Sequence, residues 1–120
     1  MMKAVAATVK TIVYPVGDLT RAKAFFGALL GTQPYMDEVY FVGYHVDGRE
    51  IGLDPNGHRQ GMTGPVCYWH VADIRESLQR LLVAGATLRQ DVIDVGGGKL
   101  TALAVDADGN IIGLVQEAGV

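Results

Sequence analysis

Apolar and polar residues follow the same order twice along the chain. In each copy a strand-like segment comes first, and a segment whose apolar residues have helical spacing follows it. In the first copy, Thr8–Val16 is rich in β-branched and aromatic residues, which predicts a strand. Asp18 is a candidate helix N-cap, and Gly31 is a natural helix end. The apolar residues between them are spaced to form one face of a helix: Ala22, Phe25, Phe26, Leu29 and Leu30.

The second copy repeats this order in the other half of the chain. Pro65–Val71 predicts a strand, Asp73 caps a helix, and Gly85 ends that helix. Its predicted apolar face consists of Ile74, Leu78, Leu81 and Leu82. The two capping aspartates, Asp18 and Asp73, lie 73 − 18 = 55 residues apart. A repeat of this length indicates a duplicated structural unit.

Each helix is followed by three short β-like segments separated by turn residues. Asp47-Gly48 and Asp108-Gly109 are hairpin signals, and the glycines from Gly96 to Gly98 indicate a further turn. The predicted strands are Gln33–Met36, Val39–Val46, Glu50–Leu53, Thr87–Val95, Lys99–Val105 and Ile111–Gln116. We therefore expect an α+β fold of two βαβββ repeats, about residues 8–53 and 65–117, within one domain of residues 1–120. Asp54–Gly64 would be the linker between them.

The composition and net charge of the chain limit the kinds of molecule that it is expected to bind. Of the 120 residues, 49% are hydrophobic and 19% charged, with a net charge of −3, which gives no electrostatic basis for binding nucleic acid or an anionic membrane. We expect neither a signal peptide nor a membrane span. The single Cys67 excludes an internal disulfide and fits a cytoplasmic protein. We expect its side chain to be buried under the second helix.

Three motifs resemble those of the vicinal oxygen chelate superfamily, which includes glyoxalase I, extradiol dioxygenases and the fosfomycin- and bleomycin-resistance proteins. The motifs are the two Val-x-Asp-Leu/Ile caps at Val16–Leu19 and Val71–Ile74, the helix ending Phe25–Gly31, and the last hairpin Val105–Leu114. The resemblance runs from Thr8 to Glu117. It implies two modules forming a half-open, curled mixed sheet around a cavity, with the helices outside, and it implies a homodimer.

The resemblance also implies where a metal would be held. Metal-using members place a His on a leading strand, seven residues before the capping Asp, and a Glu on a closing strand. Those positions are Thr11, Val66, Gly52 and Gly113 in this chain. Since valine and glycine side chains offer no ligand and threonine is a poor one, we expect no metal, no other cofactor and no catalytic residue.

The cavity implied by the resemblance would take a small molecule. Without two glutamates its centre would be roomy and mainly apolar, with tyrosines as aromatic walls, while Trp69 would point toward the helix layer. The expected ligand-binding residues are Thr11, Val13, Tyr35, Tyr40, Tyr44, Gly52, Val66, Tyr68, His70 and Gly113.

The sequence leaves two main candidate functions and two further alternatives. The first is a metal-free binding protein that sequesters a hydrophobic or aromatic natural product, as in antibiotic self-resistance. The alternative is a metal-dependent glyoxalase-like lyase or dioxygenase, against which the four replaced ligands argue. A metal-free enzyme using His70 or a tyrosine as an acid–base group, and a ligand sensor, are further alternatives.

Overall fold

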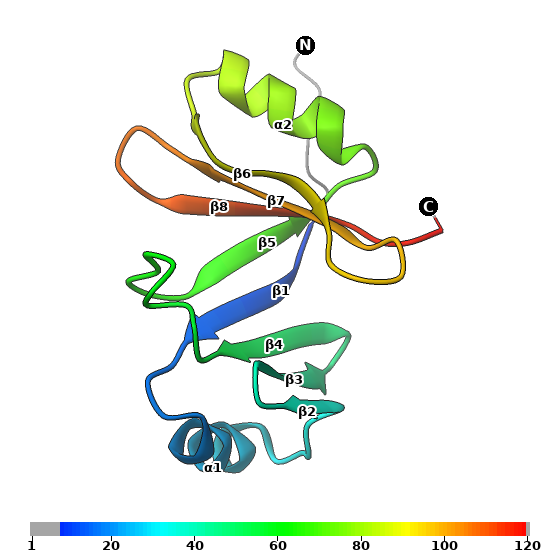
Figure 1. Cartoon of the computed structure of the whole chain (residues 1–120). Helices are drawn as coiled ribbons and strands as arrows, with labels where there is room; N and C mark the ends of the chain where they lie inside the picture. The colour runs from blue at the N-terminus through cyan, green and yellow to red at the C-terminus, as the bar shows by residue number, and fades with distance from the viewer. Residues whose placement is uncertain (1–7, 120) are drawn as a thin grey trace. The chain divides into compact units, whose positions relative to one another are not determined.

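The computed structural model describes residues 8–119, which form two helices and eight strands (Figure 1). The helices are α1 (Leu19–Leu30) and α2 (Ile74–Val83). The strands are β1 (Thr8–Pro15), β2 (Met36–Glu38), β3 (Phe41–Val46), β4 (Arg49–Asp54), β5 (Val66–His70), β6 (Thr87–Asp94), β7 (Leu100–Val105) and β8 (Ile111–Gln116). They group into two compact units, Lys10–Val66 (the first unit) and the rest of the described chain (the second unit).

In the first unit the strands lie in the order β2-β3-β4-β1. β1 runs parallel to β4, whereas β3 is antiparallel to both of its neighbours. The turn between β3 and β4 is Asp47-Gly48, and both residues have positive φ, at 56° and 79°. Two successive positive φ values are typical of the tight hairpin turn that the sequence predicts here.

The second unit repeats this arrangement with the order β5-β8-β7-β6. β5 is parallel to β8, and the other pairs are antiparallel. Each helix begins at the predicted cap: the Asp18 carboxylate accepts from the Arg21 N–H at 3.0 Å, and that of Asp73 from the Glu76 N–H at 3.1 Å. The predicted α+β class, with open mixed sheet and a βαβββ order in each half, is confirmed. The single domain and the shared cavity stay predictions.

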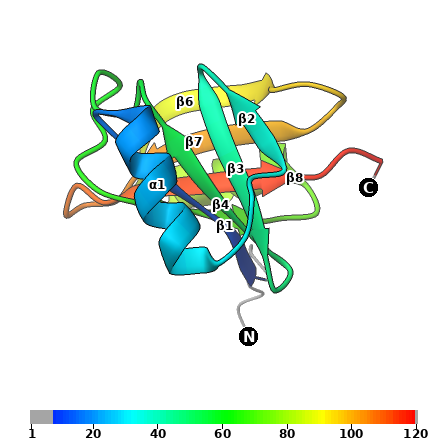
Figure 2. The same cartoon turned by 90° about the horizontal axis from the view of Figure 1, so that it is seen from below.

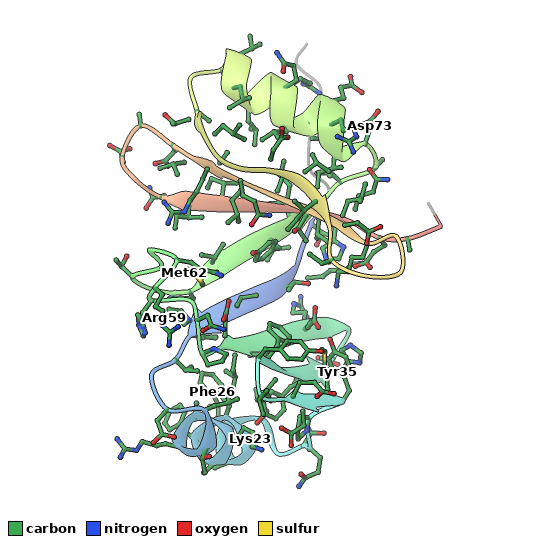
Figure 3. The ribbon with its side chains drawn as sticks, viewed as in Figure 1. Lys23, Phe26, Tyr35, Arg59, Met62 and Asp73 are labelled. Atoms are coloured by element: carbon green, nitrogen blue, oxygen red, sulfur yellow. The ribbon has the colours of Figure 1, made fainter. Side chains whose placement is uncertain are left out.

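α1 covers one face of the first unit's sheet, as Figure 2 shows. The core beneath it contains Val42, Tyr44 and Leu53, each at most 1% exposed. Phe26 reaches from α1 toward this core (Figure 3). Phe25 and Leu29, which the periodicity assigned to the same apolar face, are instead 64% exposed each. That part of the prediction is wrong, because the apolar stripe of the helix is wider than its contact with the sheet.

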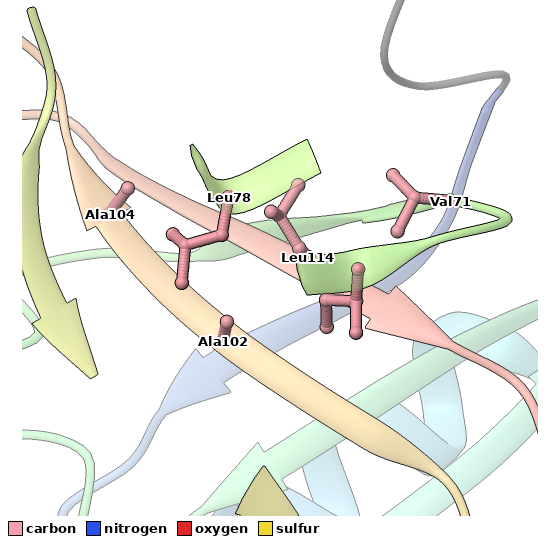
Figure 4. Packing of buried hydrophobic residues seen from close by; sticks show 6 residues of the cluster. Val71, Leu78, Ala102, Ala104 and Leu114 are labelled. Carbon is pink, nitrogen blue, oxygen red and sulfur yellow. The ribbon is translucent and has the colours of Figure 1, made fainter. Parts of the chain in front are cut away.

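α2 packs over β6, β7 and β8 of the second unit. The core beneath it is drawn in Figure 4 and comprises Val71, Ile74, Leu78, Ala102, Ala104 and Leu114. Leu81 and Leu82 pack against this cluster, so the predicted apolar face of the second helix is confirmed in full. The backbone N–H of Ile74 donates to the Gln116 side chain at 2.9 Å, which ties the start of α2 to the end of β8.

Of two expectations for β5, the burial of Cys67 is wrong and the direction of Trp69 is confirmed. Cys67 is exposed, not buried under α2. Trp69 pairs with Leu114 and so lies on the helix side of the sheet as expected, but it remains 37% exposed. The reason is that α2 lies over β6–β8 and leaves β5 less covered.

The strand predicted at Gln33–Met36 begins later, at Met36. The reason is that Pro34 has no N–H to donate to a strand partner. Pairing with β3 starts one residue later, where the Tyr35 N–H donates to the Gly43 carbonyl at 2.9 Å. Neither helix within residues 8–119 is long and apolar enough to cross a membrane.

Candidate functional site

The sheet of the first unit has a second face, opposite α1, which we call the first glycine face. Strand register places its residues in two rows, because directly paired residues share a face. One row contains Thr11, Glu50 and His45, and the other contains Val13, Gly52 and Gly43. Phe41, two residues before Gly43 on β3, alternates onto the same face.

Aromatic rings cover both glycines of this face. A Cβ atom added to Gly52 would overlap Cζ of Phe41, and one added to Gly43 would lie 2.7 Å from Cε1 of Tyr35. Real Cβ atoms do not approach this closely, so the rings rest where only glycine leaves room. Glycine in these strands therefore seats an aromatic side chain of the chain itself.

The Tyr35 ring connects this aromatic surface to polar groups. It stacks on the His45 ring with centroids 3.8 Å apart and planes 13° apart. The Tyr35 hydroxyl donates to Oε2 of Glu50, and the Thr11 hydroxyl donates to Oε1 of the same carboxylate at 3.4 Å. Thr11 is 8% exposed and Tyr35 is 48% exposed, so the cluster extends from a buried hydroxyl to an accessible ring.

The second unit has its own glycine face, on which Tyr68 pairs with Gly113 and His70 pairs with Val115. A Cβ added to Gly113 would lie 2.7 Å from Cγ and from Cδ2 of Tyr68. The His70 Nδ1 lies 3.5 Å from Oε2 of Glu117, to which Lys99 Nζ also comes within 4.0 Å. This face therefore carries one ring over its glycine and a carboxylate between two basic side chains.

These contacts correct one expectation from the sequence. We expected Gly52 and Gly113 to open space by removing glutamate side chains. The space next to each glycine is instead filled by the ring of Phe41 or Tyr68. The missing side chains are replaced by aromatic surface contributed from a neighbouring strand.

The expected ligand-binding residues divide between several places. Thr11, Val13, Gly52 and Tyr35 lie together on the first glycine face, and Tyr68, His70 and Gly113 lie together on the second. Val66 is 4% exposed and shares the face of Tyr68 by alternation along β5. Tyr40 lies in the turn between β2 and β3 and is 57% exposed.

Tyr44 lies on the opposite side of the sheet, in the core under α1, where it is 1% exposed. Its hydroxyl donates to the Lys23 carbonyl at 3.2 Å. Burial raises the pKa of the Tyr44 hydroxyl above its usual value, with a smaller upward effect from Asp37 and an opposing one from Lys23. Tyr44 also borders a cavity of about 470 Å³ beside the end of α1, across which Lys23 and Asp37 form an ion pair at 3.0 Å.

Sequence reasoning missed three residues of the first glycine face: Phe41, His45 and Glu50. A signal for two of them was available. Gly52 was assigned inward, so alternation along the strand places Glu50 on the same face. The Asp47-Gly48 hairpin then sets the pairing of His45 with Glu50, which the structure contains.

The residues do not fit the divalent ion that the superfamily resemblance implies. Gly52, Gly113 and Val66 supply no donor atom, and rings lie against both glycines. Within residues 8–119, no group of three or more His, Cys, Asp or Glu side chains is placed to hold a metal. No chemical step through a metal is therefore derived for this site.

Solved structures share this fold. Methylmalonyl-CoA epimerase from Mycobacterium tuberculosis superposes with a TM-score of 0.76 at 18% identity, over 98% of this chain and 93% of that one. A glyoxalase/bleomycin resistance protein/dioxygenase superfamily member from Vibrio splendidus 12B01 gives a TM-score of 0.71 at 19% identity, over 92% of this chain and all of that one.

The Mn(II)-bound glyoxalase from Novosphingobium aromaticivorans matches with a TM-score of 0.68 at 15% identity, over 92% of this chain and 39% of that chain. No protein-family model matches the sequence, and no curated protein does. At these identities the likeness establishes the fold alone. The chain has the fold of the glyoxalase/bleomycin resistance protein/dioxygenase superfamily, as the motifs predicted.

Proposed function

We propose that this protein is a metal-free binding protein that sequesters a hydrophobic or aromatic natural product, in the manner of antibiotic self-resistance. One observation carries the proposal. Both closing-strand positions at which the superfamily resemblance implies a glutamate ligand are glycines, and each is covered by an aromatic ring, Phe41 or Tyr68. Aromatic surface in place of carboxylates suits stacking against a flat organic molecule.

Sequestration requires burial of the ligand and no chemical step. The first glycine face offers the edges and faces of Phe41, Tyr35 and His45 for apolar contact, and Glu50 and Thr11 for orientation. A site of this composition gains affinity from apolar area and selectivity from a few polar groups. A protein that acts in this way binds one ligand per site and returns it unchanged.

The test is equilibrium dialysis against a panel of aromatic antibiotics, with mass spectrometry of the recovered ligand. We expect saturable, stoichiometric binding and an intact ligand. Phe41→Leu should weaken the affinity by roughly two- to tenfold, since an aromatic contact contributes about 0.5–1.5 kcal/mol beyond its area. The matched control is Phe25→Leu on the exposed side of α1, which should leave the affinity unchanged. Equal effects of both substitutions, or conversion of the ligand, would contradict the proposal.

The alternative function is a metal-dependent lyase or dioxygenase, which only the fold likeness favours. Elemental analysis separates the two after the protein is incubated with divalent ions and desalted. We expect far less than one ion per chain. One bound ion per chain, together with turnover that chelation abolishes, would establish the enzyme instead.

As part of this proposal, the protein acts in the cytoplasm as a homodimer, which is the assembly that the superfamily resemblance implies. Its chain mass is 12.8 kDa, so light scattering during size-exclusion chromatography should give twice this value. A monomer at micromolar concentration would remove the dimer from the proposal and leave ligand binding to be tested separately.

A further inference from the structure

The cavity beside the end of α1, which we call the α1 pocket, lies wholly within the first unit. Its volume is about 470 Å³, and its walls come from α1, from the segment that connects α1 to β2, and from β2 and β3. Tyr44, which is 1% exposed, forms its inner side. Because Tyr44 lies on the helix side of the sheet, the α1 pocket is on the opposite side from the first glycine face.

Glycine keeps this pocket open. Gly27 lies inside α1, where glycine is less favourable than alanine because it loses more backbone freedom on folding. Close packing would explain a glycine here, but a Cβ added to Gly27 would meet no atom of another part of the chain within 4 Å. The same holds at Gly31, the left-handed C-cap of α1. Packing within residues 8–119 therefore does not use the room beside Gly27.

One charged group of each sign lines the α1 pocket. Nζ of Lys23, on α1 (Figure 3), lies 3.0 Å from Oδ1 and 3.1 Å from Oδ2 of Asp37. An ammonium group has three donors and an ionised carboxylate has about four acceptor positions, so this ion pair exhausts neither group. Burial has the largest effect on the pKa of the Tyr44 hydroxyl, but Lys23 lowers that pKa and Asp37 raises it, which places both charges near the inner side of the pocket.

A ligand with a single charge suits this arrangement poorly. An anion attracted to Lys23 would also meet the carboxylate of Asp37, and a cation attracted to Asp37 would also meet the ammonium of Lys23. A molecule that carries an ammonium and a carboxylate on one carbon places each beside the group of opposite sign, so that the four charges alternate. Next to the charged pair the wall consists of Ala24, Gly27 and the ring of Pro34, which leaves room for an apolar side chain.

We infer that the α1 pocket binds an α-amino acid with an apolar side chain, its carboxylate beside Lys23 and its ammonium beside Asp37. Thr32 and Gln33, both exposed, line the same pocket with a hydroxyl and an amide, which donate and accept and so suit either ligand group. The inference is independent of the proposed function, because the two sites lie on opposite sides of the sheet and share no residue.

Three probes that share a phenyl ring test the inference: L-phenylalanine, phenethylamine and 3-phenylpropionate. Each is titrated into the full chain at pH 7 and followed by backbone amide NMR shifts. Phenylalanine carries both charges, phenethylamine only the ammonium, and phenylpropionate only the carboxylate. We expect phenylalanine to bind about two- to fivefold more tightly than either analogue, the effect of one exposed charge pair, with shifts at Gly27, Gly31 and Gln33. Binding of phenylalanine no tighter than that of both analogues would overturn the inference.

Two charge variants assign the ligand groups. Lys23→Gln should weaken the binding of phenylalanine and phenylpropionate but not that of phenethylamine. Asp37→Asn should weaken the binding of phenylalanine and phenethylamine but not that of phenylpropionate. Affinities that neither variant changes would overturn the inference.

A size variant locates the bound molecule. Gly27→Leu places a side chain in the pocket and should abolish the binding of phenylalanine. The matched control is Ala28→Leu, which adds the same side chain at the next, exposed position of α1 outside the pocket and should leave the affinity unchanged. Circular dichroism establishes that each variant is folded.

The outcomes separate this inference from the proposed function. Phe41→Leu alters the first glycine face alone, so it should leave the affinity for phenylalanine unchanged. Binding that Phe41→Leu weakens and Gly27→Leu does not would assign the amino acid to the first glycine face and overturn the inference. Absence of binding by all three probes would overturn it as well, while the antibiotic panel still decides the proposed function.

Discussion

The two glycine faces share a backbone feature, a glycine in the closing strand covered by an aromatic ring, but the ring comes from a different side chain in each. Gly52 and Gly113 stand at equivalent places in the closing strands β4 and β8, within Ile51-Gly52-Leu53 and Ile112-Gly113-Leu114. The ring over Gly52 comes from β3 and touches with its far end, Cζ of Phe41. The ring over Gly113 comes from the parallel partner β5 and touches with its near end, Cγ of Tyr68. The repeat thus preserves the close approach of a ring to glycine, and not the residue that provides the ring.

The carboxylates differ as well. Glu50 lies within its strand and accepts two hydroxyl protons. Glu117 follows β8 and lies near two basic side chains, His70 and Lys99. The first face is consequently a set of hydrogen-bond acceptors beside aromatic rings, whereas the second contains an ionic group. The same strand order can therefore support two different surface chemistries.

The largest expected effect tests whether the two units depend equally on their helix-side cores. Leu53 and Leu114 follow the equivalent glycines and are 0% and 1% exposed. Leu53→Ala and Leu114→Ala should each lower the free energy of unfolding by about 3 kcal/mol, because each leaves a cavity in a packed core. Urea denaturation measures the loss. Leu29→Ala on α1, 64% exposed in the native chain, is the control and should cost less than about 1 kcal/mol.

The next effect sharpens the contrast between the two rings. Gly113→Ala should destabilise by about 2 kcal/mol, because the new methyl group meets Tyr68 at Cγ, next to the backbone, where the ring cannot swing away. Gly52→Ala should cost about 1 kcal/mol, since it meets the movable end of Phe41. Denaturant unfolding of both variants gives the order. A larger cost at Gly52 would show that the Phe41 ring is the more tightly held of the two.

Local chemistry made much of this fold predictable. The caps Asp18 and Asp73 and the Asp47-Gly48 turn each depend on neighbours within a few residues of the chain, and the structure contains all three. The exposure of Phe25 depends on where α1 meets a sheet built from distant residues. Sequence periodicity gives the direction of an apolar face, but not how much of that face is covered.

The candidate site was less predictable for a similar reason. Alternation correctly grouped Thr11 with Val13 and Tyr68 with His70, because both pairs lie within one strand. The ring of Phe41 over Gly52 crosses from one strand to another, and its reach depends on side-chain rotamers that a sequence pattern does not specify. The resulting error was to read a missing side chain as empty space.

A smaller effect concerns the helix-side cores. The register makes Tyr44, paired with Ile51, the counterpart of Ala104, paired with Ile112. Only the first unit thus buries a hydroxyl at this place, and it donates to the Lys23 carbonyl. Tyr44→Phe should cost about 1 kcal/mol at pH 7, the net contribution of one hydrogen bond.

The Tyr44 substitution should also change how stability depends on pH. Burial raises the pKa of Tyr44 above its usual 10.0, so folding favours the protonated hydroxyl. That stabilisation is complete below pH 10.0 and is lost as the pH rises through the folded-state pKa. The wild-type chain should therefore lose more stability than Tyr44→Phe between pH 9 and about pH 12, measured by urea unfolding. Parallel curves would contradict the burial of this hydroxyl.

The smallest effect compares the turns that precede β4 and β8. The turn before β4 has two successive residues with positive φ, Asp47 and Gly48, whereas the turn before β8 has one, Gly109, and is also held by the carboxylate of Asp106. Oδ2 of Asp106 accepts from the Asn110 side chain at 2.9 Å, and Oδ1 accepts from the N–H groups of Asn110 and Asp108 at 2.8 and 2.9 Å. These bonds, the side-chain bond of Asn110 foremost and its backbone bond next, hold the pKa of Asp106 below its usual 3.8 against an opposing effect of burial.

A carboxyl group with a lowered pKa stabilises the fold above its ordinary value and loses that contribution as the pH falls through the folded-state pKa. Asn110→Ala should therefore raise the pKa of Asp106 toward the ordinary range and make the turn less sensitive to acid. Carbon-detected NMR titration of the Asp106 carboxyl, in the wild-type chain and in Asn110→Ala, measures this pKa and the pH range over which the turn changes. Because the group lies in a surface turn, the global stability should change little, and an unchanged Asp106 titration in Asn110→Ala would mean that the backbone N–H groups alone hold the charge. In that case the two turns would differ less than their side chains indicate, since both would be set by backbone geometry.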